Sequence, residues 1–411
     1  MEVRLNITRR QSGNHLSDKI ILMNKLQIQE VLSKSDLKEF IHLPEKLHNN
    51  HVNWVHPIYK DEWDYFNPKK NRAFSYCDTT IILARIEGEA VGRIMGIINH
   101  RYNDEKKEKV ARFSFFDCIN EREVSDLLLS YVEKWATDKG MIKIIGPFGM
   151  CYQDPIGFMI EGFNERPSLT ANYNFEYMIS LLQSAGYSRE IDLVVYKIDI
   201  PEELPPVYVQ IQNKALQNPK LRILNFTTRK ELHRYIHPVL ALMNESFTEI
   251  YGYSQLDENE MLDLANHFIP LLDPKLVAVV TYDEEVAGFM ITIPSINEGI
   301  IASRGHLFPL GFLKILKASK NASQLDLLIG GIKAKYRGMG IDVLIAVHII
   351  NIAKKAGFKS IDSHLELESN WKMRAENEKL GGTVYKKYRN FKKQLNVQNA
   401  GSATENQSPM L

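Results

Sequence analysis

Cysteine is scarce in this sequence. Its 411 residues contain three cysteines, Cys77, Cys118 and Cys151, which lie far apart and form no Cys-x-x-Cys pair. That spacing argues against a disulfide framework and against a thiolate metal site. We therefore expect small buried thiols in a reducing cytoplasm, and no bound metal ion.

Two other features are missing: an excess of charge and a long apolar run. Lys and Arg number 51 against 50 Asp and Glu, so bulk charge gives no reason to expect a nucleic-acid partner. No apolar run approaches the roughly 20 residues of a membrane-spanning helix. The N-terminal stretch MEVRLNITRRQSGNHLSDK lacks the apolar core of a secretory signal. We expect a cytoplasmic protein.

The chain divides into two halves of similar length. Prolines near residues 200–220 break regular structure and predict a linker over 201–220. Residues 1–22 are expected to form a flexible extension, and the polar stretch 395–411 a disordered tail. The predicted domains are therefore 23–200 and 221–394. Both show the same order of strands, hairpin and helices, which suggests a duplication.

A glycine-bracketed turn connects a strand to a helix in the second half. The apolar strand 325–329 precedes Arg337-Gly338-Met339-Gly340, and a long helix follows. A helix N-terminus presents free N–H groups and a partial positive charge, and glycine lets backbone approach a phosphate closely. The turn is thus either a pyrophosphate cradle or a tight connection with no ligand.

The surrounding sequence resembles the GNAT superfamily of acyl-CoA-dependent N-acyltransferases. Element order matches over residues 222–390, as do the Arg/Gln-x-x-Gly-x-Gly/Ala loop and the later segment from Asn370 to Gly381. The resemblance implies an α+β fold of two tandem domains, each a mixed, mostly antiparallel sheet flanked by helices. It implies acyl-CoA as co-substrate and an amine acceptor. The implied cofactor-binding residues are Ile332, Lys333, Arg337, Gly338, Met339, Gly340, Ile341, Asp342 and Asn370.

Three positions depart from the family pattern. Asp342 stands at the final Gly/Ala of the loop, Asn377 where many relatives have a tyrosine acid, and Gly382 where an aromatic follows. A carboxylate near a pyrophosphate is unfavourable unless it points outward, where it suits the first turn of a helix. The first half is similar to the same superfamily, but its loop position reads CINEREVSD and has no glycine. We interpret it as a degenerate domain without cofactor binding.

The strand after the long helix carries several titratable residues. Strand alternation over 360–369 predicts that Asp362, His364, Glu366 and Glu368 share one face. Either this face is solvated or caps the next helix, or it lines a cleft where His364 or Glu366 acts as the base. The candidate proton donors for the departing thiolate are Tyr385 and Tyr388, the tyrosines nearest in sequence to Asn377.

An apolar and basic segment, residues 306–320, lies between the second hairpin and the cofactor strand. It has seven large apolar residues within ten positions, and lysines recur at 314, 317 and 320. It is a buried helix whose lysines reach solvent, a segment on an anionic membrane surface, or the roof of an acyl-chain groove. The features GRIMGIIN, YRGMGID and LGGTVYKKYR also resemble large bacterial tandem-GNAT proteins, a group that includes ceramide synthases.

These features are relevant to four possible functions. The leading one is acyl-CoA-dependent N-acylation of an amine, with a long acyl chain and a sphingoid-type lipid amine as one version. A non-catalytic CoA- or anion-binding module and acetylation of a small soluble amine are the alternatives. Transfer from aminoacyl-tRNA is disfavoured because the chain has no basic arm.

Overall fold

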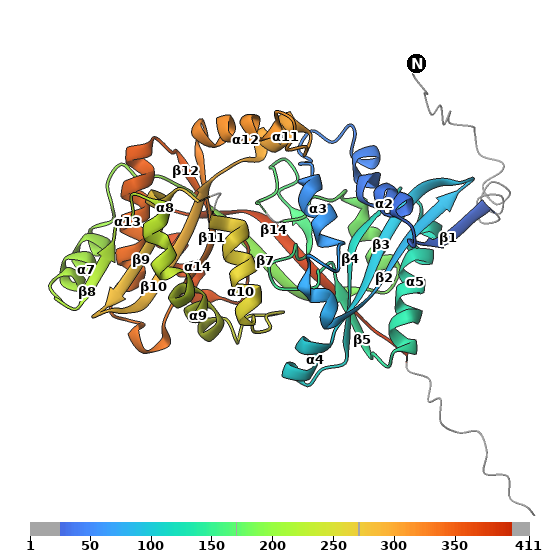
Figure 1. Ribbon diagram of the computed structural model, residues 1–411, viewed down its shortest axis with the longest axis horizontal. Helices are drawn as coiled ribbons and strands as arrows, with labels where there is room; N and C mark the ends of the chain where they lie inside the picture. The colour runs from blue at the N-terminus through green and yellow to red at the C-terminus, as the bar shows by residue number, and fades with distance from the viewer. Residues whose placement is uncertain (1–24, 170, 270–271, 397–411) are drawn as a thin grey trace, which may run out of the picture.

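The computed structural model describes residues 25–169, 171–269 and 272–396. The predicted extension 1–22 and nearly all of the predicted tail 395–411 lie outside these residues. Figure 1 shows two lobes side by side, with the first half of the chain in one and most of the second half in the other.

The first half begins with a strand, a capped helix and a long hairpin. Ser33 and Asp36 form a capping box at the start of α2, which fixes where that helix begins. Its main elements are β1 (Leu26–Glu30), α2 (Lys34–Leu47), α3 (Tyr59–Tyr65), β2 (Cys77–Ile86), β3 (Glu89–Asn99), α4 (His100–Lys106), β4 (Val110–Cys118), α5 (Arg122–Asp138), β5 (Lys143–Gly146), β6 (Phe158–Glu161) and α6 (Tyr177–Ser184).

The second half repeats this order with additional helices. The segment 201–220, predicted as a linker, contains a helix. β7 (Ser188–Asp199) is the last strand of the first half, and the main elements that follow it are α7 (Pro206–Leu216), β8 (Leu221–Leu224), α8 (Arg229–Leu232), α9 (Ile236–Ser246), α10 (Glu258–Phe268), β9 (Val277–Tyr282), β10 (Glu285–Pro294), α11 (Asn297–Ser303), α12 (Gly311–Lys320), β11 (Gln324–Ile332), α13 (Ile341–Ala356), β12 (Ser360–Asp362), β13 (Glu366–Leu367), α14 (Trp371–Lys379) and β14 (Thr383–Gln394).

All of these strands belong to one sheet that runs through both lobes. Its order is β1-β2-β3-β4-β5-β14-β7-β12-β11-β10-β9-β8, with β6 on β14 and β13 on β7. The last strand of each half is exchanged: β14 pairs with β5 of the first half, and β7 pairs with β12 of the second. Figure 1 shows β14 crossing between the lobes. The two halves therefore share backbone hydrogen bonds and cannot separate without breaking them.

Most strand pairs are antiparallel, and the described parallel pairs are β4–β5 and β11–β12. Each parallel pair is short. β11 and β12 are matched over three residues, ending at Asp326 opposite Asp362, while β11 continues to Ile332. The two strands therefore diverge beyond that pair, and the edge of β11 that faces β12 has no strand partner there. A wedge-shaped opening in the sheet, the β11–β12 splay, results.

Helices cover both faces of the sheet. On one face of the second half, α13 packs its apolar side chains on the sheet, among them Leu344, Ile345 and Ile349. On the opposite face, α9 and α10 build a separate core around Met243 and Phe289. Burial of these side chains provides the main stabilisation of the lobe.

The predicted strand 360–369 is wrong in one respect. It is broken into β12 and β13, and between them His364 has a left-handed backbone with φ of +63°. The predicted alternation fails because the four steps from Asp362 to Glu366 lie opposite only three steps of β7, from Lys197 to Val194, so Asp362 and Glu366 face opposite sides of the sheet.

Candidate active site

The glycine loop leads from β11 into α13 and has the backbone needed for an anion site. Gly338 and Gly340 both have positive φ, +80° and +81°, which favours glycine. A Cβ on Gly338 would meet nothing within 4 Å, so the space above the loop is open there. The first helical hydrogen bond runs from the Leu344 N–H to the Gly340 carbonyl at 2.9 Å. The N–H groups of residues 341–343 therefore remain without helical acceptors.

The basic side chains beside the loop differ in how far they are neutralised. Lys333 and Lys335 contact Glu285 at 2.8 and 2.7 Å. Hydrogen bonds from Lys333, Lys335 and Tyr336 lower the pKa of Glu285 to about 2. Arg337 is exposed, and its Nε donates to the Ile332 carbonyl at 3.4 Å. Within the described residues, no carboxylate lies at ion-pair distance from Arg337, so its charge is available to a ligand.

Asp342 lies in the first turn of α13 with an exposed side chain. Its negative charge contributes to the raised pKa of Tyr208 on α7 and of Lys379 on α14, after larger contributions from burial or from Glu376. A role for Asp342 in cofactor binding stays a prediction.

Asn370 caps helix α14. Its side-chain oxygen accepts a hydrogen bond from the Met373 N–H at 3.4 Å, as a helix N-cap residue does. The cap accounts for an asparagine at this position without a ligand. A role for Asn370 in cofactor binding stays a prediction.

Glu366 has the properties of a proton-transfer group. It lies on β13 opposite Val194, and its Oε1 accepts a hydrogen bond from Asn377 Nδ2 at 2.7 Å. Its buried Oε2 has no hydrogen-bond partner among the described residues. The nearby Ser363 hydroxyl already donates a hydrogen bond to the His364 carbonyl. Burial raises the pKa of Glu366 to about 7, against the opposing effects of Asn377 and Ser363.

His364 is engaged by the backbone. Its Nδ1 accepts a hydrogen bond from the Leu365 N–H at 2.7 Å, which places the proton of a neutral ring on Nε2. Burial lowers the pKa of His364, while Asp362 and a backbone hydrogen bond with Leu169 act in the other direction. A ring held in this way is a weaker candidate for a base than Glu366.

Tyr385 belongs to a buried cluster that sequence reasoning missed. Asp362 Oδ2 accepts hydrogen bonds from Tyr385 at 2.5 Å, Lys386 at 2.9 Å and Ser168 at 2.8 Å. Asp362 and Lys386 are almost completely buried. Burial opposes ionisation, but Lys386 and the hydrogen bonds hold the pKa of Asp362 below its usual range. Burial and Asp362 raise the pKa of Tyr385 far above its usual value, which makes it a poor acid.

Asp326 is a second buried carboxyl at the base of the splay. It pairs with Asp362 across the last rung of the β11–β12 ladder, and Gln324 Nε2 donates to its Oδ1 at 2.7 Å. Burial and the neighbouring Asp362 raise the pKa of Asp326. Sequence reasoning missed it as well, since a single Asp in an apolar strand gives little signal.

The splay separates two chemical environments on the two faces of the sheet. Glu366 is opposite Val194, whose side chain packs in the core under α13. Asp362 is opposite Lys197, which lies over the Tyr385 ring on the other face. Glu366 therefore lies on the α13 side of the sheet, and the Asp362 cluster lies on the opposite side.

The corresponding splay in the first half is closed by the chain itself. The Phe148 N–H donates to the Phe113 carbonyl at 2.8 Å, just beyond the last β4–β5 pair. The Tyr177 hydroxyl donates to the Cys118 carbonyl at 2.7 Å, at the end of β4. The interpretation of this half as a degenerate domain without cofactor binding stays a prediction.

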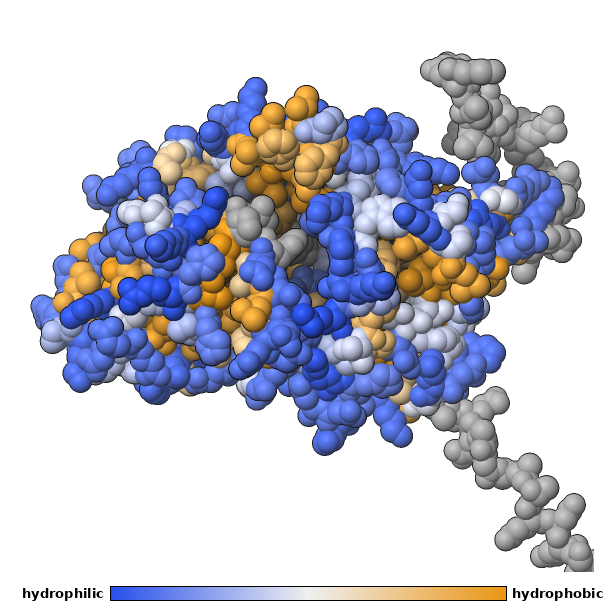
Figure 2. Space-filling model, in the orientation of Figure 1, coloured by the Kyte–Doolittle hydropathy of each residue, from blue (hydrophilic) through white to orange (hydrophobic). Residues whose placement is uncertain are grey.

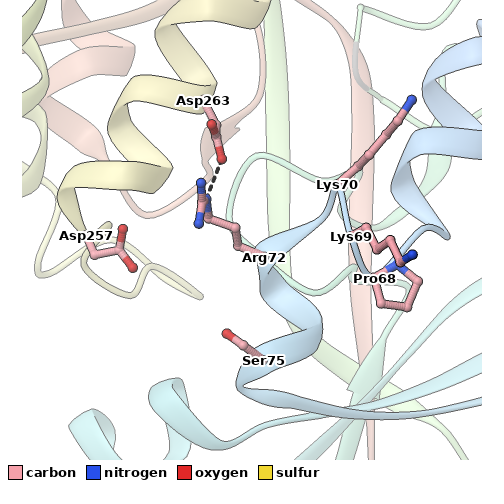
Figure 3. Close-up of a pocket in the computed structure, with 7 residues that line it drawn as sticks. All are labelled: Pro68, Lys69, Lys70, Arg72, Ser75, Asp257 and Asp263. Carbon is pink, nitrogen blue, oxygen red and sulfur yellow. Dashed lines mark hydrogen bonds and ion pairs between the residues drawn. The ribbon is translucent and has the colours of Figure 1, made fainter.

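Two surface hollows lie elsewhere. One, of 510 Å³, is lined by charged residues of the segment 68–75 and of α10 and its N-cap, and contains the Arg72–Asp263 ion pair (Figure 3). The other, of 740 Å³, lies beside His51 and Phe175 in the first half. Neither includes a residue of the glycine loop. In the described part of the chain, no three His, Cys, Asp or Glu side chains are grouped to hold a metal ion.

Comparison with known proteins shows that the fold is that of GNAT acyltransferases in tandem. A tandem GNAT protein from the clavulanic acid biosynthesis pathway superposes with a TM-score of 0.53 at 11% identity, over 91% of this chain and 100% of that one. A glucosamine N-acetyltransferase region of a fungal multi-domain β-N-acetylglucosaminidase gives 0.51 at 12% identity, over 89% and 38%. The predicted fold class and GNAT resemblance are confirmed. No family model matches the chain.

The chain is also similar in sequence to two curated bacterial proteins. A bacterial ceramide synthase of Caulobacter vibrioides is 25% identical over 377 residues, which span 90% of this chain and 98% of that protein. Protein YghO of Escherichia coli is 23% identical over 377 residues, spanning 90% and 95%. These similarities support an acyltransferase, without fixing its acyl group or its acceptor.

Proposed function

We propose that this protein is an acyl-CoA-dependent N-acyltransferase whose second half binds the co-substrate. The observation that carries the proposal is the alignment of three features on one side of the sheet. These are an open glycine loop with free N–H groups, a splay between parallel strands, and Glu366 with an unpartnered oxygen. In this arrangement Arg337 and the loop N–H groups bind the pyrophosphate of CoA.

The chemistry assigned to the site is aminolysis of a thioester. The neutral amine attacks the thioester carbonyl carbon, a C–N bond forms, and the C–S bond breaks. Glu366 takes the proton from the amine and can return it to the departing thiolate, since a carboxyl with a pKa of about 7 does both near neutral pH. Backbone N–H groups on the unpaired edge of β11 steady the oxyanion.

The acceptor we propose is a lipid-type amine, acylated with a long chain. The similarity to a ceramide synthase over nearly the whole chain supports this choice. Acetylation of a small soluble amine is the alternative outcome of the same chemistry. We assign the enzyme to the cytoplasm and propose that residues 23–200 shape the acceptor side, where Ser168 reaches Asp362.

A non-catalytic CoA-binding module is the second candidate function. It is favoured by Asn377, which occupies the position where many GNAT enzymes have a tyrosine acid, and which donates to Glu366. A module of this kind would bind CoA through the same loop but would turn over no substrate.

Binding and turnover together distinguish these functions. Calorimetry with CoA, acetyl-CoA and palmitoyl-CoA is followed by a thiol-release assay with a sphingoid base and with a small soluble amine. The proposal expects CoA binding, tighter binding of palmitoyl-CoA, and thiol release with the lipid amine. Binding without release from any amine would favour the module, and absence of CoA binding would exclude both.

A further inference from the structure

Helix α12 presents an apolar surface to solvent rather than to the core. Among the described residues, fourteen large apolar side chains are exposed, and five of them lie within residues 308–316. They form what we call the α12 surface: Phe308, Leu310, Phe312, Leu313 and Leu316. Figure 2 shows it as a hydrophobic cluster over α12 at the upper edge of the molecule. The buried-helix interpretation of this segment is therefore wrong.

The reason for this exposure lies in how α12 packs. Its inner side lies against α11, where a Cβ added to Gly299 would come within 2.5 Å of Ile315 Cα and 3.0 Å of Ala318 Cβ. This close contact already uses the side of the helix that faces the protein. The opposite side has no covering element among the described residues, and Phe308 is 76% exposed.

The charged side chains of α12 itself are all basic. Residues 299–323 contain four basic residues and neither Asp nor Glu. Arg304 is paired with Glu45 at 3.0 Å, while Lys314, Lys317 and Lys320 are exposed on α12. Apolar side chains flanked by lysines suit the boundary between acyl chains and anionic headgroups. A symmetric contact with a second copy would instead place two sets of lysines against each other.

The α12 surface also lies close to the junction of the two halves. On α11, Asn297 Nδ2 donates to the Pro167 carbonyl at 3.0 Å. The neighbouring Ser168 is hydrogen-bonded to Asp362 in the cluster across the splay. The helix hairpin α11–α12 is thus linked through one loop to the face on which we propose that the acceptor arrives.

We infer that the α12 surface docks the enzyme on an anionic phospholipid bilayer. Its apolar side chains enter the headgroup boundary, and its lysines contact anionic lipid. The inference rests on the proposed function, because docking there would bring the loop 163–168 to a lipid amine acceptor in the bilayer. In the described residues, no helix combines the length and apolar character needed to cross a membrane.

The test is sedimentation of the full chain with vesicles of phosphatidylcholine, with and without phosphatidylglycerol, in the absence of substrate. We expect binding that requires phosphatidylglycerol and falls with salt. Phe308→Ser/Leu313→Ser and Lys317→Glu/Lys320→Glu should each weaken it about tenfold or more. All four side chains are exposed, so thermal melts should be unchanged.

Matched control variants test whether vesicle binding depends on the α12 surface or on exposed apolar and basic side chains in general. Leu32→Ser/Val52→Ser removes two side chains that are 85% and 86% exposed in the first half, and should bind vesicles like the wild type. Lys230→Glu/Lys355→Glu changes the net charge equally and should have little effect. Equal binding by all variants, or no binding by the wild type, overturns the inference.

Two further outcomes have defined meanings. A dimer in light scattering that Phe308→Ser/Leu313→Ser dissociates would assign the surface to a second copy and overturn membrane docking. Acylation of a detergent-solubilised amine without vesicle binding would refute docking and leave the proposed function intact. Vesicle binding without acyl transfer would support docking and refute the proposed function.

Discussion

Replacing Glu366 by Gln tests the proton-transfer role through two opposite effects. Gln keeps the size of the side chain and the oxygen that accepts from Asn377 at 2.7 Å, but it cannot ionise. If Glu366 is the base, turnover should fall by at least about tenfold, and by up to about 10²–10⁴-fold. The wild-type kcat/KM should rise with pH around the free-enzyme pKa of about 7 and then level off.

The same substitution should stabilise the protein at alkaline pH. The folded-state pKa of Glu366 is about 7 and its ordinary value 4.5, so the folded state holds the proton more tightly than the unfolded state. The wild type therefore loses stability as the pH rises from 4.5 to about 7, by up to about 3 kcal/mol. Glu366→Gln should lack this loss and unfold at higher denaturant concentration at pH 8, with no such gain at pH 4.

Urea unfolding at several pH values and a thiol-release assay measure both effects on the same preparations. Glu368→Gln is a matched control because Glu368 is partly exposed and paired with Arg189. Full activity of Glu366→Gln would refute the catalytic role. Wild-type activity that follows no ionisation near pH 7 would refute it as well.

Three further predictions concern the loop and the buried cluster. Lys386→Met leaves the Asp362 carboxylate buried without its cation and should destabilise the protein by about 3–5 kcal/mol, whereas the double variant Lys386→Met/Asp362→Asn should recover much of this in urea unfolding. Gly338→Val should cost about 1 kcal/mol of stability because φ is +80°, and should weaken CoA binding in calorimetry beyond that small change; unchanged affinity would place the pyrophosphate elsewhere. Asp342→Asn should leave CoA affinity nearly unchanged in the same assay, and a large gain would show that this carboxylate faces the ligand.

The local elements could be predicted from the sequence because their signals are local. The hairpin of β2 and β3 turns at Glu87-Gly88, and α13 ends at Gly357, which has the left-handed backbone of a C-cap. The glycine loop was predictable for the same reason. Its order of strand, turn and helix lies within thirty or so consecutive residues.

The exchange of strands could not be predicted this way. β14 pairs with β5, although Phe391 and Gly146 lie far apart in the sequence. Hydrophobic pattern specifies which face of a strand is buried, but not which strand lies beside it. The two halves of the sequence therefore do not correspond to two separate sheets.

The buried Lys386 illustrates a weaker signal that was overlooked. Lysine in a strand suggests a solvated face, yet Lys386 shares its face with Tyr388 and Asn390, and all three are buried. A bulge at Tyr385 also brings that side chain to Asp362. The ion pair between Lys386 and Asp362, which lie 24 residues apart, offsets the cost of burying the two charges. Composition alone gives no indication of this pair.

The prediction that Asp362 shares a face with Glu366 failed because of the conformation of His364 between them. Its left-handed φ of +63° is uncommon for a residue other than glycine. The Leu365 N–H bond to its ring and the His364 N–H bond to Asp362 Oδ1 at 2.8 Å hold this conformation. Such local side-chain hydrogen bonds compete with strand pairing and are not visible in an alternation pattern.

Calorimetric titration with CoA tests whether the loop from Arg337 to Gly340 binds the pyrophosphate of CoA. The wild type should bind CoA, and Arg337→Glu should bind it more weakly by about 1–3 kcal/mol, the size of a lost charge-assisted hydrogen bond. Lys355→Glu, at the far end of α13, should bind like the wild type. Equal CoA affinity in Arg337→Glu and the wild type, or no CoA binding at all, would show that this loop does not bind the pyrophosphate.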